Sequence, residues 1–205
     1  MAHYFENDDT LKSKIQENVA IINNEKFIFY TDVGVFSKKG LDFGTRTLLE
    51  SLEIEKIHGK VLDFGCGYGP IGIYVAHKTD AEVHMIDVNR RSLELARKNV
   101  STNHVNVQIY ESNLYTNIKD TFDYIISNPP IRVGKKILYQ ILEEAKEHLK
   151  PNGQLWIVIH KDQGAKTTME FLSQFYSVEV KNKNKGFYII CATNNWHLDT
   201  TLIKL

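Results

Sequence analysis

Three glycines at alternate positions constrain the fold of this chain more than any other feature of its sequence. Gly65, Gly67 and Gly69 follow a short apolar run at 61–64 and precede an apolar helical pattern at 71–76. Glycine has no Cβ atom, so the backbone can turn sharply there and a ligand can approach closely. The N-terminus of the following helix favours a negative ligand group. The segment therefore predicts a strand, a ligand-binding loop and a helix, in that order.

Strand and helix patterns alternate from Lys60 onward, which predicts an α/β fold. Crossovers between parallel strands are right-handed and place helices on both faces of the sheet. The final two strands are expected to be antiparallel, because a short turn cannot make a parallel crossover. Strands are expected at 61–64, 82–87, 105–110, 122–127, 155–159, 178–180 and 187–190, a turn at 151–153, and helices at 71–76, from Asn89 to 100, at 137–149 and at about 165–175.

The first part of the chain predicts a β-hairpin followed by a helix. Alternating apolar residues at 19–22 and 27–30 flank an Asn-Asn turn, and Asp42 is suited to cap a helix over 45–50. The domain boundaries that we expect are 1–55 for the N-terminal hairpin and helix, which pack on the main domain, 56–193 for that domain, which contains the glycine loop, and 194–205 for a C-terminal tail.

Composition narrows the class of protein. The 205 residues include 25 Lys or Arg and 25 Asp or Glu, and 42% are hydrophobic. This balance is ordinary for a globular protein, and no apolar run approaches the roughly 18–20 residues of a membrane span. Two cysteines without a disulfide framework indicate the cytoplasm. Residues 131–205 carry 11 basic and 7 acidic side chains, although the whole chain has no net charge. Charge therefore allows the binding of nucleic acid only through a local basic patch.

The glycine loop and an acid after the second strand indicate an adenosine-containing cofactor. Residues 67–72 also satisfy the dinucleotide pattern G-x-G-x-x-G, and Asp87 follows Gly67 by 20 residues. A carboxylate at that place can accept hydrogen bonds from a ribose diol, which NAD and S-adenosylmethionine both have. These residues alone do not decide between the two cofactors. Cys66 is expected to be a small side chain of a crowded loop rather than a nucleophile.

An Asn-Pro-Pro element favours one of the two cofactors. Asn128, Pro129 and Pro130 follow the strand expected at 122–127, at the edge where ligands bind in parallel sheets. The Asn128 side-chain oxygen and the Pro129 carbonyl can each accept a hydrogen bond from a planar amine. Such bonds hold the amine in line with a methyl sulfonium and favour the charge that develops on it. A hydride-transfer enzyme has no such need; a simple strand terminator is the structural alternative.

Together these motifs resemble class I S-adenosylmethionine-dependent methyltransferases that act on amines. The blocks Thr31-Asp32-x-Gly34-Val35-Phe36-Ser37 and Leu41-Asp42-x-Gly44-Thr45-x-x-Leu48-Leu49 further resemble the small-subunit ribosomal RNA guanine-N2 methyltransferases. The resemblance covers about residues 3–192. It implies a Rossmann-like, seven-stranded, mostly parallel sheet that ends in an antiparallel hairpin. It also implies S-adenosyl-L-methionine as the cofactor and ribosomal RNA or the small ribosomal subunit as the partner.

The resemblance implies a set of site residues. The methionine part of the cofactor is expected at Asp63, Gly65 and Gly67, its ribose at Asp87 and its adenine at Asn113, which a turn cap would explain equally well. Basic side chains after the Asn-Pro-Pro element could hold phosphates beside a flipped base. The expected residues are Asp63, Gly65, Cys66, Gly67, Gly69, Asp87, Val88, Asn113, Leu114 and Asn128 for the cofactor, Asn128, Pro129, Pro130 and Ile131 for catalysis, Phe36, Arg132, Lys135 and Lys136 for the substrate, and none for a metal.

Two departures from the family pattern leave the target open. Ile131 stands where the motif commonly has an aromatic residue, and base stacking on an aromatic ring gives roughly 1–3 kcal/mol. The best-known members have two methyltransferase-like domains and this chain has one, so the N-terminal hairpin, a homodimer or the ribosomal particle must help to hold RNA. The alternative functions are methylation of a protein glutamine amide and non-catalytic RNA binding.

Overall fold

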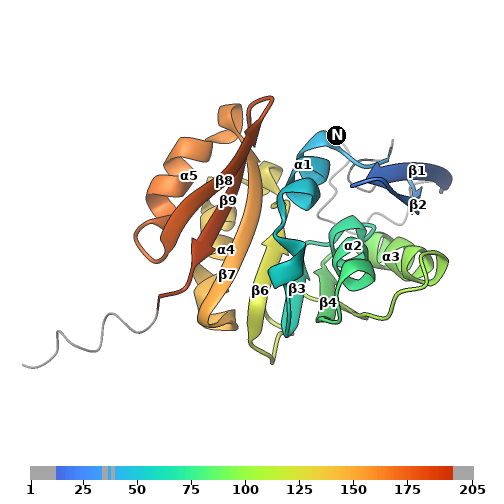
Figure 1. Cartoon of the computed structure of the whole chain (residues 1–205), viewed down its shortest axis with the longest axis horizontal. Coiled ribbons are helices and arrows are strands. Elements are labelled where there is room, and N and C mark those ends of the chain that lie inside the picture. Colours follow the sequence, from blue (N-terminus) through green and yellow to red (C-terminus); the bar gives the residue numbers. More distant parts are fainter. Residues whose placement is uncertain (1–12, 34–36, 38–39, 196–205) are drawn as a thin grey trace, which may run out of the picture.

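Seven strands form one mostly parallel sheet, as expected from the sequence (Figure 1). The computed structural model describes residues 13–33, 37 and 40–195, except for the side chain of Arg132. The strand order is β5-β4-β3-β6-β7-β9-β8, parallel from β5 to β7 and antiparallel from β7 to β8. The strands are β3 (Lys60–Phe64), β4 (Glu82–Asp87), β5 (Gln108–Glu111), β6 (Phe122–Ser127), β7 (Leu149–His160), β8 (Ser177–Asn184) and β9 (Phe187–Thr193).

Helices cover both faces of the sheet, because alternate residues of the central strands point to opposite sides. Val61 and Ile126 belong to one hydrophobic core with α1 (Phe43–Ser51), α2 (Pro70–Lys78) and α3 (Arg90–Thr102). Their chain neighbours belong to a second core with α4 (Lys135–His148) and α5 (Ala165–Leu172) (Figure 1). Short 3-10 helices are η1 (Ile54–Lys56), η2 (Ile131–Val133) and η3 (Lys161–Gln163). In the described part of the chain, no helix is long and apolar enough to cross a membrane.

The N-terminal hairpin is held by Asn99 of α3 and by Asn103, the residue that caps the C-terminus of this helix. Strands β1 (Gln16–Ile22) and β2 (Glu25–Thr31) pair antiparallel. Asn99 accepts a hydrogen bond from the Tyr30 N–H at 2.7 Å and donates to the Tyr30 carbonyl at 3.0 Å. Asn103 makes the same pair of bonds to Ile28, at 3.1 and 2.8 Å. The two amides therefore satisfy the outer edge of β2 as a third strand would, and they dock the hairpin on α3.

Most of the expected elements differ from the structure by a few residues at their ends, and two of the differences concern β5 and β7. β5 begins at Gln108 rather than at 105, and the turn expected at 151–153 lies inside β7 as a bulge. Asn152 has a φ of 62°, so the strand can bend there and continue. The Asn152 N–H donates to the Asn194 carbonyl, and the Asn194 N–H donates to the Gly153 carbonyl, both at 2.8 Å. Asn194 is the first residue of the expected tail. The bulge is therefore paired, although proline and glycine at these positions are typical of a free turn.

Candidate active site

The candidate site lies where β3 and β6 meet. These strands are neighbours in the sheet, but the chain leaves β3 toward one side and later returns to β6 on the other. Ligands of open α/β sheets bind beyond the carboxyl ends of the strands at such a switch point. The glycine loop follows β3 there, and the Asn-Pro-Pro element follows β6. The Ser127 hydroxyl joins the two strand ends, because it donates to the Phe64 carbonyl at 2.8 Å.

The glycines of the loop have two kinds of surroundings. Gly65 and Gly67 have positive φ angles of 68° and 57°, and a Cβ atom built on either would meet nothing within 4 Å. A Cβ atom on Gly69 or Gly72 would come within 2.6 or 2.5 Å of the Met85 side chain. The first two glycines therefore face open space that a ligand can fill. The last two allow α2 to pack closely on β4.

Asp63 places an unsatisfied carboxylate oxygen at the base of the loop. Its side chain is fully buried, and its Oδ2 accepts a hydrogen bond from the Gly72 N–H at 2.8 Å. Its Oδ1 is also buried and has no hydrogen-bond partner in the described part of the chain. Burial, together with the nearby charge of Asp87, raises the pKa of Asp63 to about 8. A cationic or hydrogen-bond-donating ligand group fits this position, because it would satisfy the free oxygen.

Asp87 is fixed beside the glycine loop at the end of β4. Its Oδ2 accepts from the Gly67 N–H and its Oδ1 from the Asn89 N–H, both at 2.8 Å. Burial raises the pKa of this carboxyl group. Each carboxylate oxygen has a further lone pair, so the group can still accept two hydroxyl donors. The next residue, Val88, is half-buried.

The loop after β5 lies beside Asp87. The Ser112 N–H donates to the Asp87 carbonyl at 3.0 Å, and its hydroxyl donates to the Leu114 carbonyl at 2.7 Å. Leu114 has a φ of 50° and is half-buried. The Asn113 carbonyl accepts from Thr116, and its side chain is exposed. Asn113, the expected adenine contact, and Leu114, a further expected cofactor residue, therefore belong to a loop that is bonded to Asp87.

Asn128 is held by the first turn of α1. Its Nδ2 donates to the Thr45 Oγ1 at 2.9 Å and lies 3.5 Å from the Asp42 Oδ1. Asp42 is the N-cap of α1, as expected, and it also accepts from the Thr45 N–H at 3.1 Å and from the Thr45 hydroxyl at 2.5 Å. In the described part of the structure, the Asn128 Oδ1 accepts no hydrogen bond. The sequence pattern contained both blocks but gave no sign of this contact.

The remaining expected residues differ in their surroundings. Cys66 is 5% exposed, and burial raises the pKa of its thiol, so it is a packing residue of the loop. Pro129 is buried, while Pro130 and Ile131 are half-buried at the start of η2. The Lys135 ammonium lies 5.1 Å from the centre of the Tyr139 ring, and Lys136 is exposed. Phe36 and the side chain of Arg132 lie outside what the structure describes.

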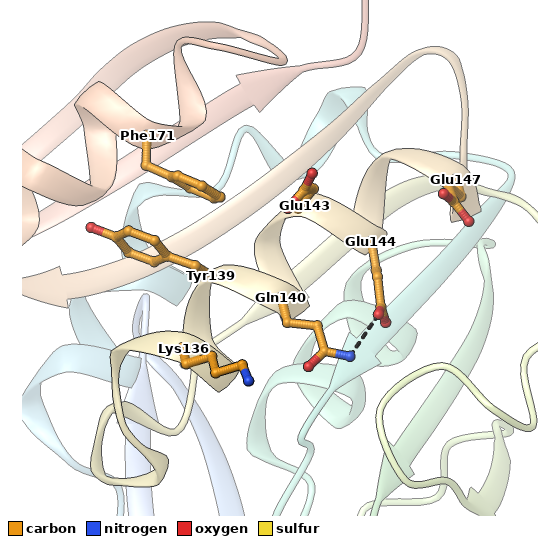
Figure 2. A pocket seen from close by; sticks show the side chains of 7 residues that line it. All are labelled: Lys136, Tyr139, Gln140, Glu143, Glu144, Glu147 and Phe171. Atoms are coloured by element: carbon orange, nitrogen blue, oxygen red, sulfur yellow. Dashed lines mark hydrogen bonds between the residues drawn. The ribbon is translucent and has the colours of Figure 1, made fainter.

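A hollow on the outer surface of α4 is lined by none of the residues of the glycine loop or the Asn-Pro-Pro element (Figure 2). The rings of Tyr139 and Phe171 stack there with centroids 4.1 Å apart, joining α4 to α5. Lys136 lines the hollow at the beginning of α4, and three glutamates follow it along the helix, at 143, 144 and 147 (Figure 2). These carboxylates make the surface unsuitable for a polyanion.

The strand order, with helices on both faces, is that of the Rossmann-like methyltransferase fold. Residues 26–191 match the family described as the methyltransferase small domain, and the chain belongs to that family. This confirms the class that the sequence motifs predict.

Several relatives are similar in sequence to all or part of this chain. The Bacillus subtilis protein YbxB, which is uncharacterized, is 47% identical over 195 residues, or 93% of this chain and 97% of that protein. Ribosomal RNA small subunit methyltransferase C of Haemophilus influenzae is 41% identical over 139 residues, or 65% of this chain and 42% of that enzyme. This chain therefore spans less than half of the H. influenzae enzyme.

A solved structure with the same fold contains two ligands. It is the T. thermophilus 16S rRNA N2 G1207 methyltransferase (RsmC) in complex with AdoMet and guanosine. The TM-score is 0.80 at 24% sequence identity, and the match covers 90% of this chain and 52% of that one. At this identity the comparison establishes the fold.

Proposed function

We propose that this methyltransferase acts on the exocyclic amine of guanine in small-subunit ribosomal RNA. The observation that carries the proposal is the amide of Asn128, which stands at the switch point with its donor side bonded to α1 and its oxygen available. The 41% identity to a ribosomal RNA methyltransferase supports the same substrate class. The proposal places the protein in the cytoplasm with the ribosomal particle.

The site fits S-adenosyl-L-methionine, the AdoMet of the T. thermophilus structure. The free Oδ1 of Asp63 suits the cationic amino group of its methionine part, and the open faces of Gly65 and Gly67 leave room for the chain that follows. Asp87 can accept hydrogen bonds from the two ribose hydroxyls. In this proposal Asn113 and Leu114 contact the adenine. Once bound, the cofactor supplies an electrophilic methyl group on a sulfonium.

The protein's task is to hold a weak nucleophile in line. The lone pair of an aromatic amine is delocalised into its ring, and the nitrogen becomes positive as it attacks. The Asn128 Oδ1 and the Pro129 carbonyl each accept a hydrogen bond from one N–H group of the amine, which fixes its plane and favours the developing charge. No strong base is needed before transfer, because the extra proton can leave to water afterwards. Ile131 gives an apolar contact to the base.

The test is nucleoside mass spectrometry of ribosomal RNA from cells with and without the gene. We expect one N2-methylguanosine to disappear in the deletion strain and to return with the wild-type protein but not with Asn128→Ala. Purified Asn128→Ala should still bind S-adenosylmethionine, which separates loss of chemistry from loss of cofactor. An unchanged RNA profile would contradict the RNA proposal, and methyl transfer to a glutamine amide of a translation protein would then replace it.

A further inference from the structure

We propose that Asp42 and Thr45 are positioning residues that set the orientation and polarity of the Asn128 amide. The inference rests on the proposed function, because it concerns how the same amide receives the substrate amine. Its basis is a chain of two hydrogen bonds that joins the first turn of α1 to the Asn-Pro-Pro element across 83 residues of sequence.

The directions of these hydrogen bonds are determined by chemistry. A threonine hydroxyl has one proton, and Thr45 donates it to the carboxylate of Asp42, which can only accept. The Thr45 Oγ1 is then restricted to accepting, so the group of Asn128 that faces it at 2.9 Å must be the NH₂. A flipped amide would place its oxygen against two acceptors. The Asn128 Oδ1 is therefore turned away from α1, where it can accept from an amine.

Close packing surrounds this chain of bonds. The Thr45 side chain is 2% exposed. A Cβ atom on Gly44 would lie 2.8 Å from the Phe187 ring and 3.2 Å from the Asp42 Oδ1, so the beginning of α1 is pressed against β9. The Thr45 N–H also fixes Asp42 as the helix cap. Positioning groups of this kind fix the geometry of a site when their own contacts are locked.

The charge of Asp42 also has a favourable sign. Methyl transfer makes the substrate nitrogen positive, and the negative carboxylate stands at the far end of the two hydrogen bonds. Each bond is polarised by the next one, so the Asn128 oxygen becomes a stronger acceptor. No proton moves along this path; the amine loses its proton to water. In this proposal Asp42 and Thr45 act through Asn128 and not through the reacting atoms.

The decisive variants are Thr45→Val, which removes the hydroxyl at nearly constant volume, and Thr45→Ser, which restores it. Thr47→Val is the matched control, since Thr47 is equally buried in the same helix and its hydroxyl donates to the Phe43 carbonyl. We expect Thr45→Val to lower kcat roughly 10–100-fold, the range for outer-shell partners of functional groups, with KM and cofactor affinity nearly unchanged. Thr45→Ser and Thr47→Val should keep kcat. Asp42→Asn retains a good helix cap and should lower kcat as well.

A second readout does not depend on activity. The side-chain NH₂ of Asn128 can be followed by nitrogen-15 NMR, with its signal assigned by its loss in Asn128→Ala. We expect slow exchange with water in the wild type and in Thr47→Val, and fast exchange in Thr45→Val. Wild-type kcat together with an unchanged amide signal in Thr45→Val would overturn the inference. Absence of RNA methylation by the wild type would instead contradict the proposed function, and the NMR comparison would still decide this one.

Discussion

At the scale of single residues, one short loop uses the same amino acid for two purposes. Gly65 and Gly67 leave space for a ligand, whereas Gly69 and Gly72 leave space for Met85. The sequence predicts the glycine loop but cannot separate these roles, because the pattern G-x-G-x-x-G is satisfied by glycines of both kinds. The separation depends on which side of the loop faces α2 and β4, and this is a property of the packed structure.

The two roles predict that an added methyl group affects cofactor binding at one glycine and only stability at the other. Gly72→Ala should lower the free energy of unfolding by about 1–3 kcal/mol, because the new Cβ atom would overlap Met85 in a closed core. Gly67→Ala should cost about 1–2 kcal/mol through its positive φ, and it should also abolish most cofactor binding. Urea unfolding and calorimetric titration with S-adenosylmethionine check both. Normal cofactor affinity in Gly67→Ala would contradict the assignment of the open space.

Asp63 predicts a pH dependence of the ligand-free protein. Burial raises its pKa from 3.8 to about 8, so between these values the folded protein holds a proton that the unfolded chain releases. Stability should therefore fall as the pH rises from about 4 to 8. Asp63→Asn should flatten this slope in urea titrations made at several pH values. Binding of the cationic cofactor should release the proton, which calorimetry in buffers of different ionisation enthalpy would detect.

At the scale of elements, α3 completes the N-terminal hairpin. Sequence periodicity predicts the hairpin and the helix separately, since each has its own apolar pattern. It cannot predict that Asn99 and Asn103, one turn apart, match the spacing of Ile28 and Tyr30 on β2. Polar side chains on a helix usually face water, so this docking had no signal in the sequence. The sequence also could not predict the bulge at 151–153, because its hydrogen-bond partner is Asn194, which lies far along the chain.

Loss of an asparagine should uncouple the hairpin from α3. Asn99 is fully buried, and besides its two bonds to Tyr30 it donates to the Tyr68 carbonyl at 2.8 Å. Asn99→Ala should lower the free energy of unfolding by at least about 1–3 kcal/mol, because buried backbone groups lose their partners. Asn103→Ala, at a half-buried position, should cost less. Equal stabilities of the two variants and the wild type in urea would contradict this account.

At the scale of the whole molecule, the turn between β8 and β9 lies at the same edge of the sheet as the site. The Gly186 carbonyl accepts from the Lys161 N–H just after β7 ends, and the Phe187 ring lies 5.7 Å from that of Phe43 at the beginning of α1. Lys185 stands 4.9 Å from the Phe43 ring, and Lys183 stands 4.8 Å from the Tyr188 ring. This turn therefore presents positive charge near Asn128, opposite in sign to the glutamates of α4.

If RNA approaches along this turn, its lysines should contribute to affinity through phosphate contacts. Lys183→Ala combined with Lys185→Ala should weaken RNA binding and reduce the dependence of log affinity on log salt by roughly 0.7–0.9 for each lost phosphate contact. Replacement of both by arginine should preserve the salt dependence, because the charge is retained. Filter binding or fluorescence anisotropy over a range of salt concentrations measures the slope. An unchanged slope in the alanine variant would place the RNA elsewhere.

The position of β9 has a consequence for how the enzyme is made. β9 is the latest strand in the described chain, yet it lies between β7 and β8 and is the neighbour against which α1 positions Asn128 (Figure 1). Until β9 has been synthesised, β8 has no partner in the sheet and the beginning of α1 lacks its contact with Phe187. On the proposed function, we therefore expect no methyl transfer by a nascent chain that ends before β9.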